Sequence, residues 1–278
     1  MKQQRIVITG GGSGLGRAMA LDHARAGWRV AVLDRDADSA AAVGDEIEAA
    51  GGKALALGCD VTDVESVGAA ATAIRRGWHG LDVLVNNAGI AGSGTVVDTP
   101  EEDWRRIMEV NLFGVVNVCR AFLPAMIRAG GGHVVNIASA AGFVSPPGVA
   151  AYNVSKAGVI SLSETLRVEL APQGIGVSVA CPSFFKTNLL EDFSGSEASR
   201  QMALRLMEKS PLDADDVARM VRRGVRKKQF MIVPHAEARA ILLLKRMSPD
   251  LFFAAVKRQA AGFLKAQGRV GSKRSARA

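Results

Sequence analysis

Residues 5–16 read Arg5-Ile6-Val7-Ile8-Thr9-Gly10-Gly11-Gly12-Ser13-Gly14-Leu15-Gly16, so that a β-branched apolar run passes directly into a glycine-rich loop. A segment of helical composition follows, and we expect its helix to start near Arg17. Glycine lets a backbone turn sharply and approach a phosphate closely, and a helix N-terminus offers free N–H groups and a positive dipole end. The loop reads TGxxxGxG, and its place between strand and helix favours a dinucleotide-binding loop over an ordinary tight turn.

Six more short apolar runs follow along the chain, each separated from the next by a segment of helical composition. They lie at residues 29–33, 54–57, 83–85, 133–137, 176–180 and 230–233. Near-continuous apolar strands that alternate with helices predict a parallel sheet covered on both faces, and right-handed crossovers make such a sheet doubly wound. We therefore predict an α/β fold with a single doubly wound parallel sheet of about seven strands. Residues 1–235 would form this one domain.

The composition changes after Pro234. From Arg219 to the end, the chain has 16 Lys and Arg but only two acidic residues, whereas the rest of the chain is mildly acidic. Apolar residues flanked by Lys and Arg recur at helical spacing on both sides of Pro249, which is expected to interrupt the helix. We expect residues 236–278 to form a basic amphipathic helical extension with a disordered end. Such helices can rest on an anionic membrane surface, pack on the body or at a subunit interface, or remain solvated without a partner.

Several classes of protein are excluded by composition. The chain has 278 residues, of which 48% are hydrophobic, 22% are charged and 30 are Gly, and this excludes disordered, collagen-like and coiled-coil proteins. Three widely spaced Cys provide no disulfide framework, and neither they nor the four His have metal-ligand spacing, so no metal is predicted. We expect no signal peptide and no membrane-spanning run of about 20 residues. These features indicate a cytoplasmic protein, with peripheral contact to a membrane through the C-terminal segment as the alternative.

Three polar residues are candidates for catalysis: Ser139, Tyr152 and Lys156. The last two are four residues apart and would lie on one face of a helix. A tyrosine with its usual pKa of about 10 is a poor base at neutral pH, whereas an ammonium group beside it favours the phenolate. We expect Lys156 to lower the pKa of Tyr152, the only tyrosine in the chain. Ser139 would place its hydroxyl against a substrate oxygen.

The order and spacing of these motifs resemble the short-chain dehydrogenase/reductase family over residues 5–235. The resemblance rests on TGxxxGxG, Asn86-Asn87-Ala88-Gly89, Asn111 in an NLFG context, Ser139, and the YxxxK pair thirteen residues later. It implies a Rossmann-type fold and NAD(P)-dependent interconversion of a secondary alcohol with a ketone or aldehyde. Tyr152 would be the general acid/base, Lys156 would also hold the nicotinamide ribose, and Asn111 would position a proton-relaying water. The resemblance further implies a homodimer or homotetramer.

The same resemblance assigns a cofactor site. Asp34, at the end of the second apolar run, would accept hydrogen bonds from an adenosine ribose and repel a 2′-phosphate, which favours NAD. Arg35 beside it could bind that phosphate, which leaves NADP open. Ser183 stands where relatives have a glycine, so the backbone turn beneath the nicotinamide is in question. The implied cofactor residues are Gly10, Ser13, Gly14, Leu15, Gly16, Asp34, Arg35, Asp60, Val61, Asn87, Ala88, Gly89, Tyr152, Lys156 and Thr187.

Four aromatic residues, Phe143, Phe184, Phe185 and Phe193, fall in or beside loops that cover the substrate in relatives. Together with Ser139 they predict a substrate pocket suited to a hydrophobic alcohol or carbonyl compound, unless the rings are simply part of the core. An alternative function is a catalytically inactive dinucleotide-binding sensor or scaffold. Specific nucleic-acid binding is not expected, because the basic tail lacks interleaved aromatic residues for stacking.

Overall fold

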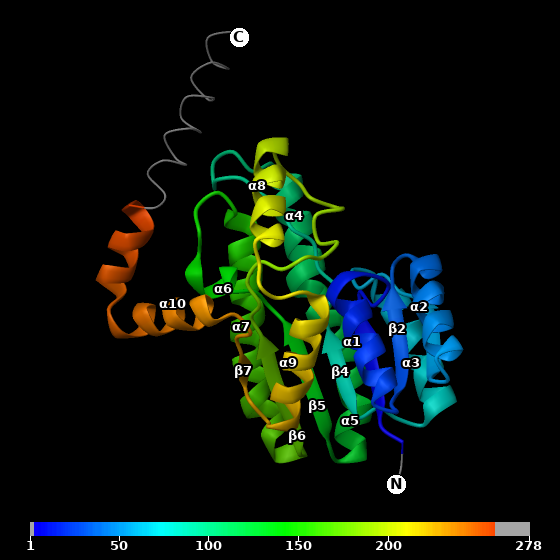
Figure 1. Cartoon of the computed structure of the whole chain (residues 1–278). Helices are drawn as coiled ribbons and strands as arrows, with labels where there is room; N and C mark the ends of the chain where they lie inside the picture. Colours follow the sequence, from blue (N-terminus) through cyan, green and yellow to red (C-terminus); the bar gives the residue numbers. More distant parts are fainter. Residues whose placement is uncertain (1–2, 259–278) are drawn as a thin grey trace.

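The computed structural model describes residues 3–258 and contains one sheet of seven parallel strands (Figure 1). The strands are β1 (Arg5–Thr9), β2 (Arg29–Asp34), β3 (Lys53–Gly58), β4 (Val83–Asn86), β5 (Gly132–Ile137), β6 (Ile175–Ala180) and β7 (Met231–Ile232). Their order in the sheet is β3-β2-β1-β4-β5-β6-β7. The chain therefore begins near the middle, winds to one edge, and returns to wind to the other. The predicted α/β fold is confirmed, and each of the seven apolar runs forms a strand.

Helices connect successive strands, and one more follows the last strand. They are α1 (Gly14–Arg25), α2 (Ala37–Ala49), α3 (Val64–Trp78), α4 (Glu101–Met108), a π-helical segment (Glu109–Phe113), α5 (Gly114–Ala129), α6 (Ala141–Val144), α7 (Ala150–Leu170), a 3₁₀ turn (Ala171–Gln173), α8 (Glu197–Glu208), α9 (Ala214–Arg226) and α10 (Ala236–Met247). Helix α1 begins three residues before the predicted start. Glycine has low helix propensity, so the sequence pattern becomes helical only at Arg17, although the N–H of Arg17 already bonds to the Ser13 carbonyl.

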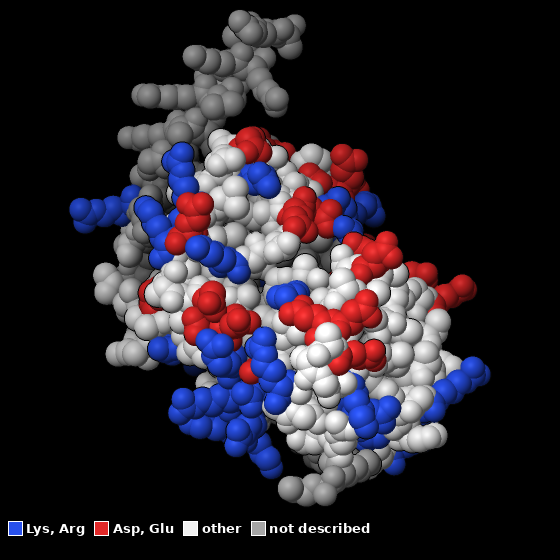
Figure 2. All heavy atoms as spheres, turned by 45° about the vertical axis from the view of Figure 1, so that its right-hand side comes forward, with Lys and Arg blue, Asp and Glu red and all other residues white. Residues whose placement is uncertain are grey.

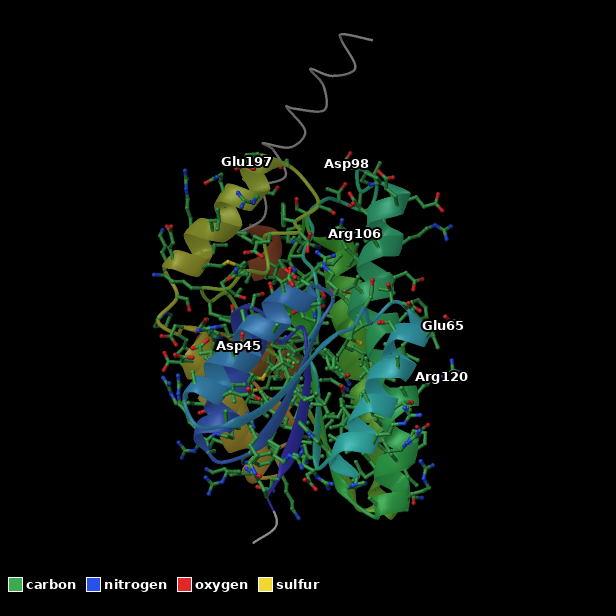
Figure 3. The ribbon with its side chains drawn as sticks, turned by 90° about the vertical axis from the view of Figure 1, so that its right-hand side faces the viewer. Asp45, Glu65, Asp98, Arg106, Arg120 and Glu197 are labelled. Carbon is green, nitrogen blue, oxygen red and sulfur yellow. The ribbon has the colours of Figure 1, made fainter. Side chains whose placement is uncertain are left out.

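Successive side chains of the strands point to opposite faces of the sheet, and each face is covered by its own layer of helices. Ile6 and Ile8 of β1 pack with α1, α2 and α9. Val7, between them, points to the layer formed by α3, α5 and α7. Figure 3 shows the strands between these two layers. Burial on both faces explains why the strands are apolar at every position rather than at alternate positions.

A chain of buried polar side chains fixes α7 against the centre of the sheet. Asn86 Nδ2 donates to Asn136 Oδ1 at 2.8 Å, and Asn136 Nδ2 donates to Ser163 Oγ at 2.9 Å. These three residues lie on β4, β5 and α7, respectively. A buried donor that lost its partner would cost about 1–3 kcal/mol, so this chain of bonds disfavours sliding of α7 along the sheet. The position of α7 matters because it carries Tyr152 and Lys156.

One helical run in the described part of the chain, Glu101–Ala129, could span a membrane by length and composition alone. It comprises α4, the π-helical segment and α5. Val118, Phe122 and Met126 of this run are buried in the core against the sheet. Packing inside the fold therefore accounts for the apolar residues of this run that face the sheet.

The described part of the C-terminal segment packs on the body. Ala238 and Phe252 are buried, and Lys245 Nζ donates to the carbonyl of Phe143 at 2.6 Å. Helix α10 ends at Met247, and a further helical segment begins at Pro249. Pro249 thus interrupts the helix as predicted. Residues 259–278 of the predicted extension, which include its predicted disordered end, lie outside the described residues.

Candidate active site

A cavity of about 850 Å³ lies at the carboxyl ends of the strands and extends from the glycine loop to α10. This is the position where doubly wound sheets bind ligands, because the strand order reverses between β1 and β4. Every residue implied for the cofactor except Gly16 lines the cavity: Gly10, Ser13, Gly14, Leu15, Asp34, Arg35, Asp60, Val61, Asn87, Ala88, Gly89, Tyr152, Lys156 and Thr187. Gly16 instead packs against the carbonyl of Gly10 within the glycine loop.

The glycine loop is compact enough to admit a pyrophosphate against its backbone. A Cβ atom placed on Gly16 would lie 1.9 Å from the carbonyl oxygen of Gly10, so a side chain at this position would force the loop apart. Asn87 Nδ2 donates to the carbonyls of Thr9 and Gly10 at 3.0 and 2.9 Å, which holds the loop to the end of β4. Ser13 makes no side-chain capping bond to α1. The N-terminus of α1 is thus open to an anion, and the loop fits a dinucleotide.

At the predicted adenosine end, two neighbouring residues have different partners. Asp34 Oδ2 accepts a hydrogen bond from the Gly12 N–H at 2.9 Å, which ties the end of β2 to the glycine loop. Arg35 forms an ion pair with Asp192, in the loop after β6. Arg106 Nη2 donates to the carbonyl of the same Asp192 at 2.7 Å. Figure 3 labels Arg106 in the upper part of the molecule, below Asp98. The loop after β6 is therefore held to the end of β2 and to α4, and all three border the cavity.

The predicted adenine position is formed by the turn after β3. Asp60 Oδ1 accepts hydrogen bonds from the backbone N–H and the hydroxyl of Thr62, both at 2.8 Å. The carbonyl of Val61 accepts from Asn117 Nδ2 at 3.0 Å, and the Val61 side chain is buried. These bonds fix the turn while leaving both residues at the cavity wall.

Ser139, Tyr152 and Lys156 converge on the middle of the cavity. Ser139 follows β5 and accepts a hydrogen bond from the Ala141 N–H at 3.1 Å. It also hydrogen-bonds with the hydroxyl of Tyr152. Lys156 Nζ donates to the carbonyl of Ile137 at 3.1 Å and lies 5.7 Å from the centre of the Tyr152 ring. The two residues share one face of α7, as their spacing predicts.

The predicted direction of the Tyr152 pKa is wrong for this structure. Burial raises the pKa of Tyr152 to about 12, and the hydrogen bond from Ser139 offsets only part of the rise. Burial also lowers the pKa of Lys156 to about 8. Removal from water disfavours both charged forms, and for each group this burial is the largest cause of the shift. Sequence spacing places the pair together but does not reveal how deeply it is buried.

Asn111 lies behind the wall of the cavity rather than on it. Its Oδ1 accepts from the Ile90 N–H at 2.8 Å, and its Nδ2 donates to the Ile90 carbonyl and to Ser155 Oγ, both at 3.0 Å. It belongs to the π-helical segment, a distortion that recurs at functional sites. A Cβ on Gly89 would lie 3.1 Å from Asn111 Oδ1 and 3.2 Å from Lys156 Nζ. Asn111 and Lys156 therefore flank Gly89, and the relay role of Asn111 stays a prediction.

The turn after β6 does not need the glycine that relatives carry. Within residues 3–258, the non-glycine residues with positive φ are His79, Ser145 and Lys228, so Ser183 is not in the left-handed region. Its N–H instead donates to Nδ1 of the buried His235 at 3.1 Å. Thr187, four residues on, lies against the glycine loop: a Cβ on Gly14 would be 2.5 Å from its Oγ1. A histidine thus supports a turn that sequence comparison leaves in question.

The far end of the cavity is mainly apolar, although Glu191, Asp192 and Glu237 also line it. Phe184, Phe185 and Phe193 line it as predicted, but Phe143 does not. Phe143 is buried in the core on the α3–α5–α7 side, because the short helix α6 turns its ring inward. Sequence reasoning missed several lining residues, among them Val144, Pro146, Val149, Leu189, Leu190, Ala203, Met207, Ala238 and Ile241. Only the helical spacing of apolar residues in α8 and α10 could have indicated some of them.

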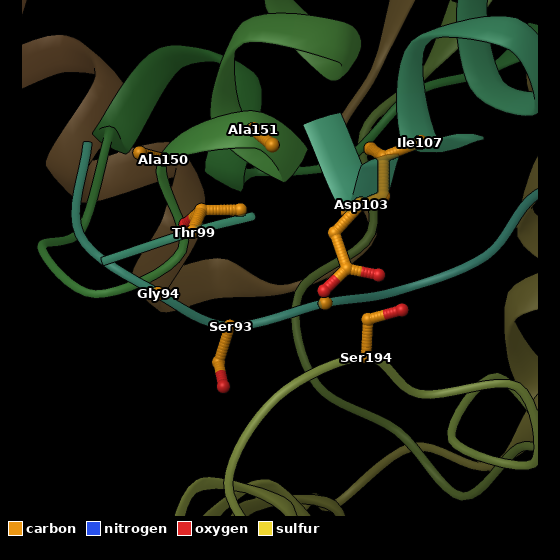
Figure 4. Close-up of a pocket in the computed structure, with 9 residues that line it drawn as sticks. Ser93, Gly94, Thr99, Asp103, Ile107, Ala150, Ala151 and Ser194 are labelled. Carbon is orange, nitrogen blue, oxygen red and sulfur yellow. The ribbon is translucent and has the colours of Figure 1, made fainter. Parts of the chain in front are cut away.

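A second, much smaller pocket lies between the loop after β4, α4 and Ser194 (Figure 4). Backbone bonds cross it, from the Ser93 N–H to the Ser194 carbonyl and from the Gly94 N–H to the Gly148 carbonyl, both at 2.7 Å. It encloses no space for a ligand. This region braces three loops around the large cavity and is not itself a binding site. Among the described residues, no three His, Cys, Asp or Glu side chains converge in a way that could hold a metal ion.

Comparisons with known proteins agree with the fold. A family model described as short chain dehydrogenase matches residues 4–198. Probable oxidoreductase EphD of Mycobacterium tuberculosis is 36% identical over 259 residues, which cover 88% of this chain but 43% of that protein, so the chain spans less than half of this relative. The 2-(S)-hydroxypropyl-CoM dehydrogenase 3 of Xanthobacter autotrophicus is 35% identical over 213 residues, covering 76% of this chain and 84% of the relative.

Among solved structures, a short chain dehydrogenase/reductase from Burkholderia phymatum in complex with NAD is similar throughout. It is 31% identical, with a TM-score of 0.85, and the match covers 90% of this chain and 95% of that one. The chain belongs to the short-chain dehydrogenase/reductase family of oxidoreductases. Family membership, together with the NAD-bound neighbour and the glycine loop, supports a nicotinamide dinucleotide as cofactor.

Proposed function

We propose that the protein is an NAD-dependent oxidoreductase that interconverts a hydrophobic secondary alcohol and its ketone or, for a primary alcohol, the aldehyde. One observation carries the proposal. Ser139, Tyr152 and Lys156 meet in the middle of one cavity, between the glycine loop at one end and apolar side chains at the other. A dinucleotide and an apolar substrate bound at the two ends would therefore face each other at these three residues.

In this proposal, Tyr152 transfers a proton to or from the substrate oxygen. A bound nicotinamide would supply the hydride for reduction or accept it in oxidation. The Ser139 hydroxyl donates a hydrogen bond to the carbonyl oxygen, and the Tyr152 phenol delivers its proton as the alkoxide develops. With its pKa raised to about 12, the phenol keeps this proton at neutral pH, which is the state that carbonyl reduction needs.

Lys156 and Asn111 would assist the transfer of this proton. Lys156 would hold the nicotinamide ribose and, when charged, stabilise the phenolate left after proton transfer. Its pKa of about 8 allows it to pass a proton on near neutral pH. Asn111 sits beside Lys156 across Gly89, where it could position a water that connects Lys156 to the solvent.

The preference for NAD over NADP rests on two residues at the adenosine end. The carboxylate of Asp34 lines the cavity and would accept the hydroxyls of an adenosine ribose while repelling a 2′-phosphate. Arg35, which could otherwise bind that phosphate, is paired with Asp192. Both features favour NAD.

A panel of ketones and alcohols of increasing apolar size, assayed with NADH and NADPH, tests the proposal. We expect turnover with NADH and loss of about 10²–10⁴-fold in the Tyr152→Phe variant, because general acid–base catalysis contributes that much. The variant should still bind NADH, as measured by fluorescence. NADH binding without turnover of any substrate would favour the sensor or scaffold alternative, and near-normal turnover by Tyr152→Phe would overturn the mechanism.

We also propose that the protein acts in the cytoplasm as a homodimer or homotetramer. Phe113, Val154 and Val168 are 47%, 50% and 74% exposed on the outer side of the π-helical segment and α7. A second copy of the chain would cover these apolar side chains. Sedimentation equilibrium of the wild type and of Val168→Glu checks this: a monomeric wild type would contradict it, and we expect the variant to shift towards monomer.

A further inference from the structure

Helix α10 has two faces with different surroundings. Ala238 and Ile241 line the cavity, and Lys245, one turn further on the same side, bonds to the Phe143 carbonyl. On the opposite side, Leu243 and Met247 are 59% and 75% exposed. A helix at the surface of a globular protein usually turns polar residues outward. Here one apolar face borders the cavity and a second one faces away from the body.

The exposed apolar face continues beyond α10. Leu251 and Phe253, in the helical segment that starts at Pro249, are 59% and 45% exposed. Phe252 between them is buried. Lys245 Nζ lies 5.5 and 5.7 Å from the ring centres of Phe252 and Phe253, so it connects the segment after α10 to the body. We call Leu243, Met247, Leu251 and Phe253 the outer apolar face. In Figure 1 these elements stand at the margin of the molecule, outside the layers that cover the sheet.

Positive charge surrounds the outer apolar face. Arg239, Arg246, Lys257 and Arg258 are exposed on the same two helical segments. The sequence from residue 259 to the end adds five Lys and Arg and no acidic residue. Two acidic residues lie on these segments: Glu237, at the cavity wall, and Asp250. Exposed Leu, Met and Phe flanked by Lys and Arg form the pattern of helices that lie in the headgroup region of anionic membranes.

A second basic surface, at the end of α9, lacks the exposed apolar side chains. Lys and Arg gather at the lower left of the face shown in Figure 2, whereas Asp and Glu spread over its upper and right parts. Arg223, Arg226, Lys227 and Lys228 lie at the end of α9, just before β7, and therefore at the amino ends of the strands. This is the end of the sheet opposite to the cavity. No large hydrophobic side chain of this end of α9 is among the exposed ones in the described part of the chain.

We propose that the outer apolar face docks on an anionic lipid surface. The four side chains of this face would enter the headgroup region. The exposed Arg246, Lys257 and Arg258 beside them would pair with lipid phosphates. Because the inner side of α10 lines the cavity, docking would bring the substrate end of the cavity close to the lipid. The docking does not depend on the proposed oxidoreductase activity, whereas supply of an apolar substrate from the lipid does.

Co-sedimentation of the full-length chain with lipid vesicles tests the docking. Vesicles of phosphatidylcholine alone are compared with vesicles that also contain phosphatidylglycerol, at low and at physiological salt. We expect at least about tenfold stronger partitioning onto the anionic vesicles, weakened by salt because surface charges are screened. The double variant Leu243→Glu/Met247→Glu should lose about tenfold or more of this partitioning. Neither residue lines the cavity, so NADH binding should be unchanged and reports that the variant is folded.

A matched control carries the same two added charges elsewhere. Val97 and Met202 are 91% and 56% exposed and lie outside the two C-terminal helical segments. The variant Val97→Glu/Met202→Glu should therefore bind vesicles like the wild type, except for the small loss that any two added negative charges cause. Equal losses in both double variants, or wild-type binding by Leu243→Glu/Met247→Glu, would overturn the proposal. So would a result in which the α10 variant changes the molecular mass in solution but not vesicle binding, since a second copy of the chain would then be the partner of this face.

Discussion

The cofactor end and the substrate end of the cavity are built in different ways. At the cofactor end, backbone groups are held by side chains of specific types: Asn87 bonds to the carbonyls of Thr9 and Gly10, and Asp34 bonds to the Gly12 N–H. At the substrate end, mainly apolar side chains of the loop after β6, α8 and α10 form the wall. The first end depends on the identity of individual residues, whereas the second depends on size and shape. Substitutions should therefore act sharply at one end and gradually at the other.

The largest effect is expected at the cofactor end, for Gly16→Ala. The new Cβ would lie 1.9 Å from the Gly10 carbonyl oxygen, so the glycine loop must open. NADH affinity, measured by fluorescence titration, should fall by about a hundredfold or more, because the pyrophosphate loses its backbone contacts. Gly68→Ala in α3 is the control: nothing lies within 4 Å of its added Cβ, and alanine there should stabilise the helix by roughly 0.5–1 kcal/mol. Unchanged NADH affinity of Gly16→Ala would show that the loop does not carry the cofactor.

At the junction of the two ends, the pKa of Tyr152 predicts different pH profiles for the two directions. Burial raises this pKa to about 12, so the protonated phenol that reduction needs is fully present at neutral pH. Oxidation needs the phenolate, whose fraction rises up to about tenfold per pH unit below the pKa. From about pH 6 to 8, kcat/KM for oxidation should therefore rise while that for reduction stays nearly flat. Above about pH 8 the rise should weaken as Lys156 loses its charge. An oxidation rate independent of pH in this range would contradict the assignment.

A gradual effect is expected at the substrate end. Phe184 lines the cavity and is 44% exposed, so Phe184→Ala removes apolar contact without disturbing the core. KM for a bulky apolar substrate should rise by about tenfold, and KM for a small ketone should change little. Ile127→Ala serves as the control, because Ile127 is 38% exposed but does not line the cavity. Equal changes for large and small substrates would argue against an apolar pocket at this position.

The smallest effect is expected for Asp192→Asn. Asp192 belongs to the loop after β6, at the substrate end, and pairs with Arg35 at the cofactor end. Removing the carboxylate frees Arg35 from its ion pair and lets it reach a 2′-phosphate. The ratio of kcat/KM with NADPH to that with NADH should rise about three- to tenfold, a modest change because the pair is exposed. Adding Arg35→Gln to the same variant should remove the gain. If the ratio rises equally without Arg35, another group binds the phosphate.

The same difference between the ends explains what could be predicted from the sequence. Close approach of backbone to phosphate requires glycine, and the Tyr152–Lys156 pair requires helical spacing, so these residues leave clear patterns. Phe143 was misplaced because a ring in a short loop helix can turn towards the core or the cavity, and the sequence does not distinguish them. The direction of the Tyr152 pKa was missed because burial depends on the whole tertiary structure. Ile241 and Met207 lie at positions with the apolar spacing of an ordinary amphipathic helix, and this spacing does not indicate that they line a cavity.

The bond between the Ser183 N–H and His235 has a consequence for shortened forms of the protein. His235 immediately precedes α10, and Arg239 one turn later donates to the carbonyls of Val233 and Pro234 at 2.8 Å. The start of the C-terminal segment is thus fastened to the turn beneath the reaction centre. A chain that ends at Pro234 would free that turn, whereas one that ends a single residue later would keep the imidazole. Whatever the C-terminal segment contacts, the residue just before it, His235, supports the turn after β6.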